Sequence, residues 1–125
     1  MRPTPVRNLV IDDDREDIEL IDRVLLDHGY VPLLATSGQE AMQIAAMQEP
    51  ELVLLDIRMP RMDGYEIARR LRRAPGLARA LIVAVTGSAD ERERIDAAGF
   101  DGVMSKPIEP DSFLAQIEAL LNAPR

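Results

Sequence analysis

Four aspartates are the residues of this sequence best able to do chemistry together. Asp12, Asp13 and Asp14 form an uninterrupted acidic run, and Asp56 follows a separate apolar segment. Clustered carboxylates repel one another unless a cation lies between them, and a hard divalent ion with oxygen ligands, most naturally Mg²⁺, removes that cost. A carboxylate in such a site can act as a nucleophile toward phosphorus and form an acyl phosphate. The acidic residues therefore suggest a magnesium site that handles a phosphoryl group.

Two further polar groups suit the same chemistry. Thr86 follows another apolar segment and precedes Gly87 and Ser88, while Lys106 precedes Pro107. Phosphoryl transfer needs positive charge and hydrogen-bond donors around the equatorial oxygens, and an ammonium and a hydroxyl supply them. Gly87 would leave space for the phosphoryl group next to the backbone. The sequence thus contains each type of group that phosphoryl transfer to an aspartate requires.

These groups can act together only if the fold brings them to one place, and the apolar pattern predicts how it does so. Five short segments rich in Val, Ile and Leu have the pattern of strands that are covered on both faces. They are Asn8–Ile11, Val31–Ala35, Leu52–Leu55, Leu81–Val85 and Gly102–Met104. Amphipathic stretches lie between them, and the first places Ile18, Ile21 and Leu25 on one helical face. The last stretch places Phe113 and Ile117 on one stripe.

This alternation predicts an α/β fold of the doubly wound (βα)5 type, with a five-stranded parallel sheet and helices on both faces. Ligands of such sheets gather beyond the carboxyl ends of the strands. Asp12, Asp56, Thr86 and Lys106 each follow a different predicted strand. Each residue alone has a structural explanation, such as a helix cap or a surface charge. Because four strand ends carry four complementary groups, we expect them to converge on one pocket.

Polar residues and glycines mark the expected ends of the helices. The expected N-caps are Ser37, Asp63 and Asp111, and the expected C-terminal glycines are Gly29 and Gly99. Asp14 taken alone is better explained as a helix N-cap than as a metal ligand.

Length and composition bound the remaining possibilities. The chain has 125 residues, of which 46% are apolar and 30% charged, which predicts a single globular domain over residues 1–125. Its 22 acidic and 15 basic residues give a formal net charge of -7, which disfavours direct binding to nucleic acid. The absence of cysteine excludes disulfides and thiolate metal sites. Its apolar runs are too short to span a membrane and no secretory signal is evident, so we expect a cytoplasmic location.

Arginine is concentrated in the middle of the chain, where seven lie between Arg58 and Arg79. A polar helix face explains most of them without any nucleic-acid partner. Arg58 differs because it stands two residues beyond Asp56, where it could shield or bind an acyl phosphate and tune its lifetime. The alternating charges from Glu91 to Arg94 are expected to form a salt-bridged, exposed helix face.

Taken together, the motifs resemble the receiver domain of response regulators. Residues 9–14 (LVIDDD) resemble its first strand with the acidic pair, and residues 56–64 (DIRMPRMDG) are similar to its phosphorylation loop. Residues 85–87 (VTG) and 105–107 (SKP) resemble its two remaining signatures. The resemblance covers a core of about residues 6–121 and implies a flavodoxin-like strand order of 2-1-3-4-5.

The resemblance also implies a role for each group. Asp56 would accept a phosphoryl group from a phosphohistidine, with Lys106 and Thr86 as its catalytic partners. The implied ligands of Mg²⁺, the one expected cofactor, are Asp12, Asp13, Asp56 and the backbone carbonyl of Arg58. The chain would then be a signalling switch of a two-component or phosphorelay system that catalyses its own phosphorylation and slow dephosphorylation, rather than a turnover enzyme. Its partner would be a histidine kinase or a histidine phosphotransfer protein, and phosphorylation-dependent dimerisation is compatible with the resemblance.

One departure from the family pattern leaves an alternative open. Three residues before Lys106, where the family often has a mobile Tyr or Phe, this chain has Val103, and Phe100 nearby fits a core position better. A receiver-like interaction module that works without phosphorylation is therefore the alternative. A phosphohydrolase is disfavoured because its second aspartate would stand where Arg58 does. A flavin-binding electron carrier is disfavoured because the acidic run 12–14 would repel the flavin phosphate.

Overall fold

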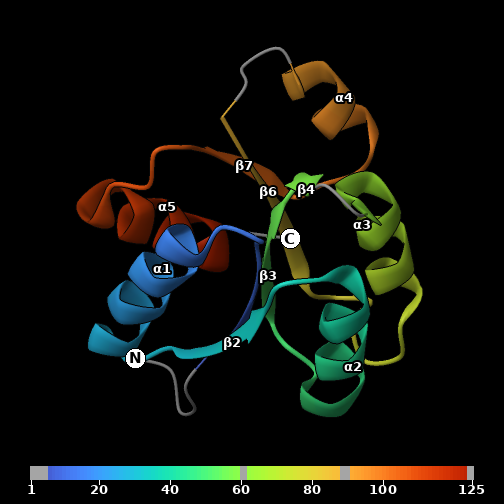
Figure 1. The fold of residues 1–125 in the computed structure, drawn as a ribbon, viewed down its shortest axis with the longest axis horizontal. Helices are drawn as coiled ribbons and strands as arrows, with labels where there is room; N and C mark the ends of the chain where they lie inside the picture. The colour runs from blue at the N-terminus through green and yellow to red at the C-terminus, as the bar shows by residue number, and fades with distance from the viewer. Residues whose placement is uncertain (1–5, 60–61, 88–90, 124–125) are drawn as a thin grey trace.

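Five parallel strands form the middle layer of the chain and have the predicted order. The computed structural model describes residues 6–59, 62–87 and 91–123. The strands are β1 (Arg7–Ile11), β2 (Val31–Ala35), β3 (Leu52–Asp56), β6 (Leu81–Thr86) and β7 (Gly102–Ser105). They lie in the order β2-β1-β3-β6-β7, which is the predicted 2-1-3-4-5 once two short strands between β3 and β6 are set aside (Figure 1). The fold prediction is confirmed.

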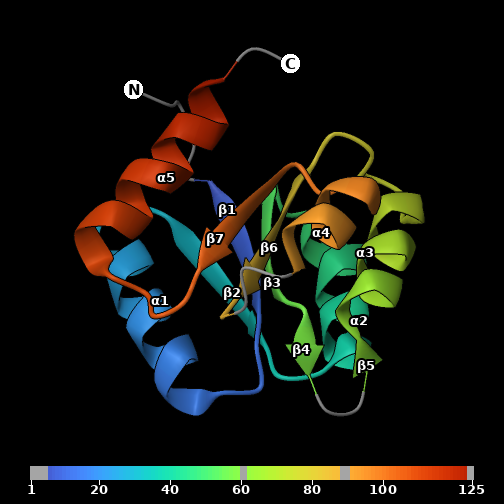
Figure 2. The ribbon, with the colours of Figure 1, turned by 90° about the horizontal axis from the view of Figure 1, so that it is seen from above.

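Helices cover both faces of this sheet. Helices α1 (Arg15–Asp27) and α5 (Pro110–Asn122) lie on one face, and α2 (Gly38–Gln48), α3 (Gly64–Arg73) and α4 (Arg92–Ala97) lie on the other (Figure 2). Within the described ranges, every helix is too short or too polar to cross a lipid bilayer.

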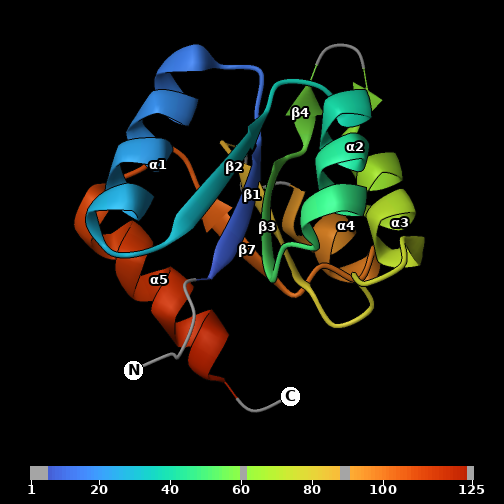
Figure 3. The same cartoon turned by 90° about the horizontal axis from the view of Figure 1, so that it is seen from below.

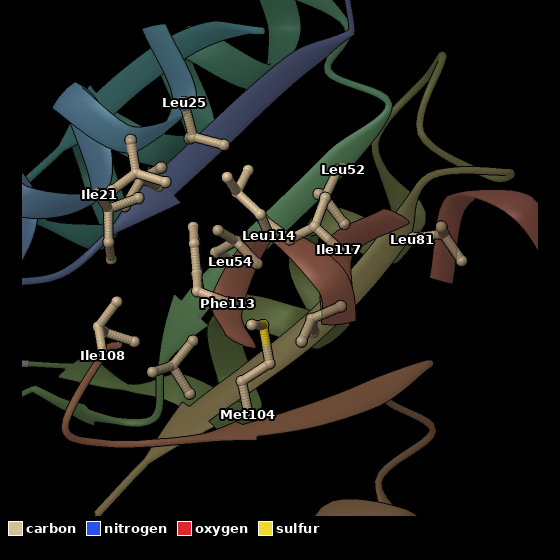
Figure 4. Close-up of a cluster of buried hydrophobic side chains, with 14 of the residues drawn as sticks. Ile21, Leu25, Leu52, Leu54, Leu81, Met104, Ile108, Phe113, Leu114 and Ile117 are labelled. Carbon is tan, nitrogen blue, oxygen red and sulfur yellow. The ribbon is translucent and has the colours of Figure 1, made fainter. Parts of the chain in front are cut away.

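The two faces of the sheet build two hydrophobic layers. Val10, Leu54 and Val83 stand side by side in register and point toward α1 and α5, where Phe113 and Ile117 complete the layer (Figure 4). Their neighbours along the strands point to the other side and pack with α2 and α3; they are Leu9, Val53 and Ile82. Because both faces are covered, most strand residues are apolar and the strands do not alternate between apolar and polar residues.

Strand β2 lies at one edge of the sheet, and in the part of the chain that the structure describes its one neighbouring strand is β1 (Figure 3). β2 pairs with β1 in parallel, with Val31 opposite Arg7 and Pro32 opposite Asn8. The Val31 N–H donates to the Val6 carbonyl at 2.8 Å, which fixes the side of β2 that faces β1.

Most of the predicted helix ends are confirmed. Ser37 and Asp63 cap α2 and α3, each accepting a hydrogen bond from a backbone N–H of the first turn. Gly29 and Gly99 follow the C-caps of α1 and α4, both with φ of 84°. The predicted N-cap at Asp111 is wrong, because α5 begins at Pro110 with Glu109 as its N-cap, so Asp111 lies inside the first turn. Proline suits that first position because its fixed φ is helical and the missing N–H needs no partner there.

The segment between β3 and α3 contains a short hairpin that the sequence did not predict. Strands β4 (Arg58–Met59) and β5 (Met62–Asp63) pair antiparallel, with Arg58 opposite Asp63. Residues 60 and 61 of the expected phosphorylation loop lie outside the described residues, as does Ser88. The hairpin leads directly into α3 at Gly64, where a Cβ atom would lie 2.5 Å from the Ile57 Cα. The first turn of α3 therefore packs against the residue that follows Asp56.

One buried polar side chain in β1 lacks hydrogen bonds. Asn8 is 0% exposed, and neither atom of its side-chain amide has a partner within residues 6–59, 62–87 and 91–123. An unsatisfied buried amide costs roughly 1–3 kcal/mol. We expect Asn8→Leu, a replacement of similar size, to raise the free energy of unfolding by about 1 kcal/mol or more, as measured by urea denaturation. Asn122→Leu, at an exposed position of α5, is the control and should change it by less than about 0.5 kcal/mol. A less stable Asn8→Leu chain would show that the amide makes an interaction that stabilises the fold.

Candidate functional site

The carboxyl ends of four strands bring the predicted site residues together. Asp12 follows β1, Asp56 ends β3, Thr86 ends β6 and Lys106 follows β7. Asp12, Asp56 and Thr86 are buried, although the other buried side chains are almost all apolar. The Lys106 ammonium lies 3.2 Å from a carboxylate oxygen of Asp12 and 3.2 Å from one of Asp56. The expected convergence of these strand ends is therefore observed.

Three of the four predicted metal ligands also lie close together. Asp12, Asp13 and Asp56 each place a carboxylate oxygen within 4.8 Å of the others. Asp13 is exposed while the other two are buried, so the cluster opens to solvent on one side. Hard oxygen donors in such an arrangement suit Mg²⁺, which keeps part of its water shell and takes only one or two protein carboxylates directly. The geometry of the donors therefore fits the expected ion.

The fourth predicted ligand, the Arg58 carbonyl, stays a prediction, but the rest of Arg58 is well placed. Its backbone N–H donates to the Asp56 carboxylate at 2.9 Å. This hydrogen bond occupies one oxygen of Asp56, while Lys106 contacts the other. The orientation of Asp56 is thus fixed from two sides before any ligand arrives.

The electrostatics of the pocket are those of crowded, buried carboxylates. Burial, together with the neighbouring Asp56, raises the pKa of Asp12 to about 6, against the opposing effects of the Asp14 backbone N–H and Lys106. Burial alone would lower the pKa of Lys106, but Asp17, Asp12 and Asp56 outweigh it and raise that pKa above its usual range. Lys106 is therefore a permanent cation at neutral pH. It offsets only part of the negative charge around it.

Asp17 is a site residue that the sequence did not reveal. Its carboxylate lies 2.8 Å from the Lys106 ammonium, closer than either Asp12 or Asp56. It stands in the first turn of α1, which Asp14 caps by accepting hydrogen bonds from the backbone N–H groups of Glu16 and Asp17. The only hint in the sequence was an acid one turn into a helix that starts beside the acidic run. The contact between Asp17 and Lys106 depends on the fold, which brings the first turn of α1 close to the end of β7.

Thr86 is buried at the end of β6, and its carbonyl accepts a hydrogen bond from the Lys106 N–H at 2.9 Å. This bond ties the two strand ends that carry the hydroxyl and the ammonium. The catalytic role of the Thr86 hydroxyl stays a prediction.

The expectation for the charges at the start of α4 is wrong in one respect. Glu91 does not belong to an exposed, salt-bridged face, because its side chain is only 14% exposed and turns toward α3. It accepts hydrogen bonds from the Arg58 guanidinium at 2.7 Å and from the Tyr65 hydroxyl at 2.6 Å. Arg94 lies over the Tyr65 ring at 4.0 Å from its centroid, and Phe100 meets the ring edge-on at 5.9 Å. Tyr65 is thus a second residue that the sequence did not reveal, and Phe100 is half-buried beside it rather than fully in the core.

Comparison with known proteins gives consistent results. A model of the response regulator receiver domain matches residues 9–118. Response regulator MprA of Mycolicibacterium vanbaalenii is 40% identical over 117 residues, which make up 94% of this chain and 51% of MprA. The chain therefore spans about half the length of the curated relatives it matches.

Solved structures share the fold. Chemotaxis protein CheY4 of Vibrio cholerae superposes with a TM-score of 0.88 at 24% identity, over 94% of this chain and 99% of CheY4. The receiver domain of sensor histidine kinase PA1611 from Pseudomonas aeruginosa PAO1 has a TM-score of 0.85 at 24% identity, over 96% of this chain and 100% of that domain. The PA1611 structure holds a magnesium ion coordinated in its active-site cleft. At these identities the two likenesses establish the fold.

Proposed function

The chain belongs to the family of response regulator receiver domains, and from this membership we propose that it accepts a phosphoryl group from a phosphohistidine donor on Asp56. It is a receiver domain of two-component signalling and therefore a signalling switch. Its acidic pocket is consistent with a phosphoacceptor site. The observation that carries the proposal is the placement of the Lys106 ammonium 3.2 Å from Asp56, beside a second buried carboxylate. That arrangement unites a nucleophile, a fixed positive charge and a set of metal ligands.

The proposed transfer assigns each residue a task. A carboxylate oxygen of Asp56 attacks phosphorus, the bond from phosphorus to the donor imidazole nitrogen breaks, and the imidazole leaves with the electron pair. Lys106 turns from the carboxylates to an oxygen of the transferred group, where its charge offsets the charge that develops. The Thr86 hydroxyl donates to another of these oxygens. Movement of Thr86 toward the phosphoryl group would change the surface around α4, to which partner proteins would bind.

The proposed ion site consists of Asp12, Asp13, Asp56 and the Arg58 carbonyl. A bound Mg²⁺ would lower the repulsion between the carboxylates and the incoming phosphoryl oxygens. The fit of three carboxylates within 4.8 Å of one another supports this site, as does the ion in the related PA1611 domain.

The raised pKa of Asp12 predicts how magnesium acts on stability. In the folded chain the pKa of Asp12 is about 6 against an ordinary value of 3.8, so its charged form costs stability, and this cost grows as the pH rises through that window. Magnesium binds the charged form and offsets the cost. We therefore expect Mg²⁺ to raise the melting temperature more at about pH 7.5 than at about pH 5, where Asp12 is mostly protonated. Thermal scans of the wild type and Asp12→Asn measure this, and an equal gain at both pH values would contradict it.

The proposed partner is a histidine kinase or a histidine phosphotransfer protein, which would dock on α1 near Arg15 and Ile18 and on the loop near Ile108. We assign the receiver core to about residues 6–121 and place the exchange in the cytoplasm, with no direct contact to nucleic acid. Phosphorylation-dependent dimerisation belongs to the same proposal.

Intact mass spectrometry tests the phosphoacceptor function. The chain is incubated with a small acyl-phosphate donor and Mg²⁺, and an adduct of about 80 Da is expected that requires the ion, as an aspartyl nucleophile demands. Asp56→Ala should lose the adduct, while Asp111→Ala, at an exposed position of α5, should keep it. If neither the small donor nor a phosphohistidine protein yields the adduct, the phosphorylation-independent interaction module is the better assignment.

A further inference from the structure

The residue two positions beyond Asp56 is tied to the start of α4. The Arg58 guanidinium donates to Glu91 Oε1 at 2.7 Å, although the two residues are 33 positions apart in the chain. Arg58 also contacts Asp56 through its backbone N–H at 2.9 Å. One residue therefore touches both the proposed phosphoacceptor and the N-cap residue of α4.

Glu91 is held in place by more than Arg58. Its second oxygen accepts a hydrogen bond from the Tyr65 hydroxyl at 2.6 Å, and Tyr65 is itself buried between Arg94 and Phe100. The Tyr65 hydrogen bond and the Arg58 charge lower the pKa of Glu91, so it is an anion at neutral pH. The carboxylate is thus a fixed acceptor, while the Arg58 side chain, at 62% exposed, can move.

A phosphoryl group on Asp56 would compete with Glu91 for the guanidinium. The group carries nearly two negative charges and three acceptor oxygens, whereas Glu91 offers one charge. Arginine pairs with phosphate through two parallel hydrogen bonds, which are stronger than the single contact seen here. Phosphorylation therefore favours transfer of the Arg58 side chain from Glu91 to the phosphoryl oxygens.

We propose that Glu91 is a positioning residue that holds the Arg58 guanidinium away from the phosphoryl site and releases it when Asp56 is phosphorylated. This inference rests on the proposed function of Asp56. A guanidinium across the phosphoryl oxygens hinders water from reaching phosphorus. Hydrolysis, in which water adds to phosphorus, the bond to the Asp56 oxygen breaks and inorganic phosphate leaves, is then slowed in proportion to the time that Arg58 spends there. Glu91 shortens the lifetime of the phosphorylated state, and its release loosens the start of α4.

The decay of the phosphoryl adduct tests this role. After phosphorylation with a small acyl-phosphate donor and removal of that donor, intact mass follows the loss of the adduct. Glu91→Gln should lengthen the half-life about two- to fivefold, the range that a partly exposed ion pair supports. Tyr65→Phe, which removes one hydrogen bond from Glu91, should act in the same direction with a smaller effect. Glu93→Gln removes the same charge at an exposed position of α4 and should leave the half-life unchanged.

The double variant separates positioning from a general structural effect. If Glu91 acts through Arg58, then Arg58→Ala and Arg58→Ala/Glu91→Gln should decay at the same rate. Hydrogen exchange of the unphosphorylated chain adds a readout that needs no adduct, and amides of residues 91–99 should exchange faster in Glu91→Gln than in Glu93→Gln. An unchanged or shorter half-life in Glu91→Gln, a difference between the two Arg58 chains, or unchanged exchange overturns the inference while leaving the phosphoacceptor function intact. A wild type without any adduct overturns both.

Discussion

Replacing Lys106 with methionine is expected to slow phosphoryl transfer to Asp56 by about 10²- to 10³-fold, the cost of removing one charged donor from a developing oxyanion. Lys106 is the only lysine in the chain, and its ammonium lies 3.2 Å from Asp56. Methionine keeps much of the length of the side chain and removes its charge. No other cation among the described residues contacts Asp56 through its side chain, so the loss has no local substitute.

The measurement is the initial rate at which the adduct forms with a small acyl-phosphate donor at saturating Mg²⁺. Asp17→Asn is the matched comparison, because it removes the negative charge of the side chain that lies 2.8 Å from the Lys106 ammonium and leaves the ammonium in place. Its rate should stay within about fivefold of the wild type, as for loss of one partly exposed ion pair. A Lys106→Met chain that is as fast as Asp17→Asn would show that Lys106 holds the pocket together without stabilising the transferred group.

Gly64→Ala should destabilise the fold by about 1–3 kcal/mol and disturb the phosphoacceptor at the same time. The added Cβ would lie 2.5 Å from the Ile57 Cα and 3.1 Å from its carbonyl oxygen. These are backbone atoms, so relief requires that α3 or the segment after Asp56 moves. Movement of Ile57 displaces Asp56, its neighbour, and we therefore expect slower phosphorylation as well.

Urea denaturation and the adduct rate together measure the two effects. Gly87→Ala is the control for stability, because a Cβ there meets nothing within 4 Å. It should change the free energy of unfolding by less than about 0.5 kcal/mol. Wild-type stability in Gly64→Ala would mean that the contact between α3 and Ile57 yields easily.

The sequence predicted the sheet well because its strands are buried on both faces. In β3 and β6 the apolar run ends where the strand reaches the pocket, and there the predictions stopped one residue early. Strands β3 and β6 include Asp56 and Thr86, which the apolar pattern excluded as polar. The same polar residues form the candidate site, so one sequence pattern predicted both the strands and the position of the site.

The contacts missed from the sequence join elements that are distant along the chain. Asp17 meets Lys106 across the pocket, and Glu91 meets Tyr65 and Arg58 between α4, α3 and β4. Alternating charges such as those after residue 91 fit an exposed helix equally well, and only the packing of α4 on α3 distinguishes the two. The error at Asp111 is local, because the proline before it already occupies the first helical position.

The edge strand β2 has a consequence for how copies of this chain behave in concentrated solution. Backbone groups of successive strand residues point to opposite sides, and the Val31 N–H points toward β1. The nitrogen of Pro32 is therefore on the open side, where it has no hydrogen to donate. An exposed edge normally offers a template on which a foreign strand can add and aggregation can begin. In this chain Pro32 leaves a gap in the row of N–H donors along the open edge of β2. The edge therefore resists pairing with a strand of a neighbouring molecule.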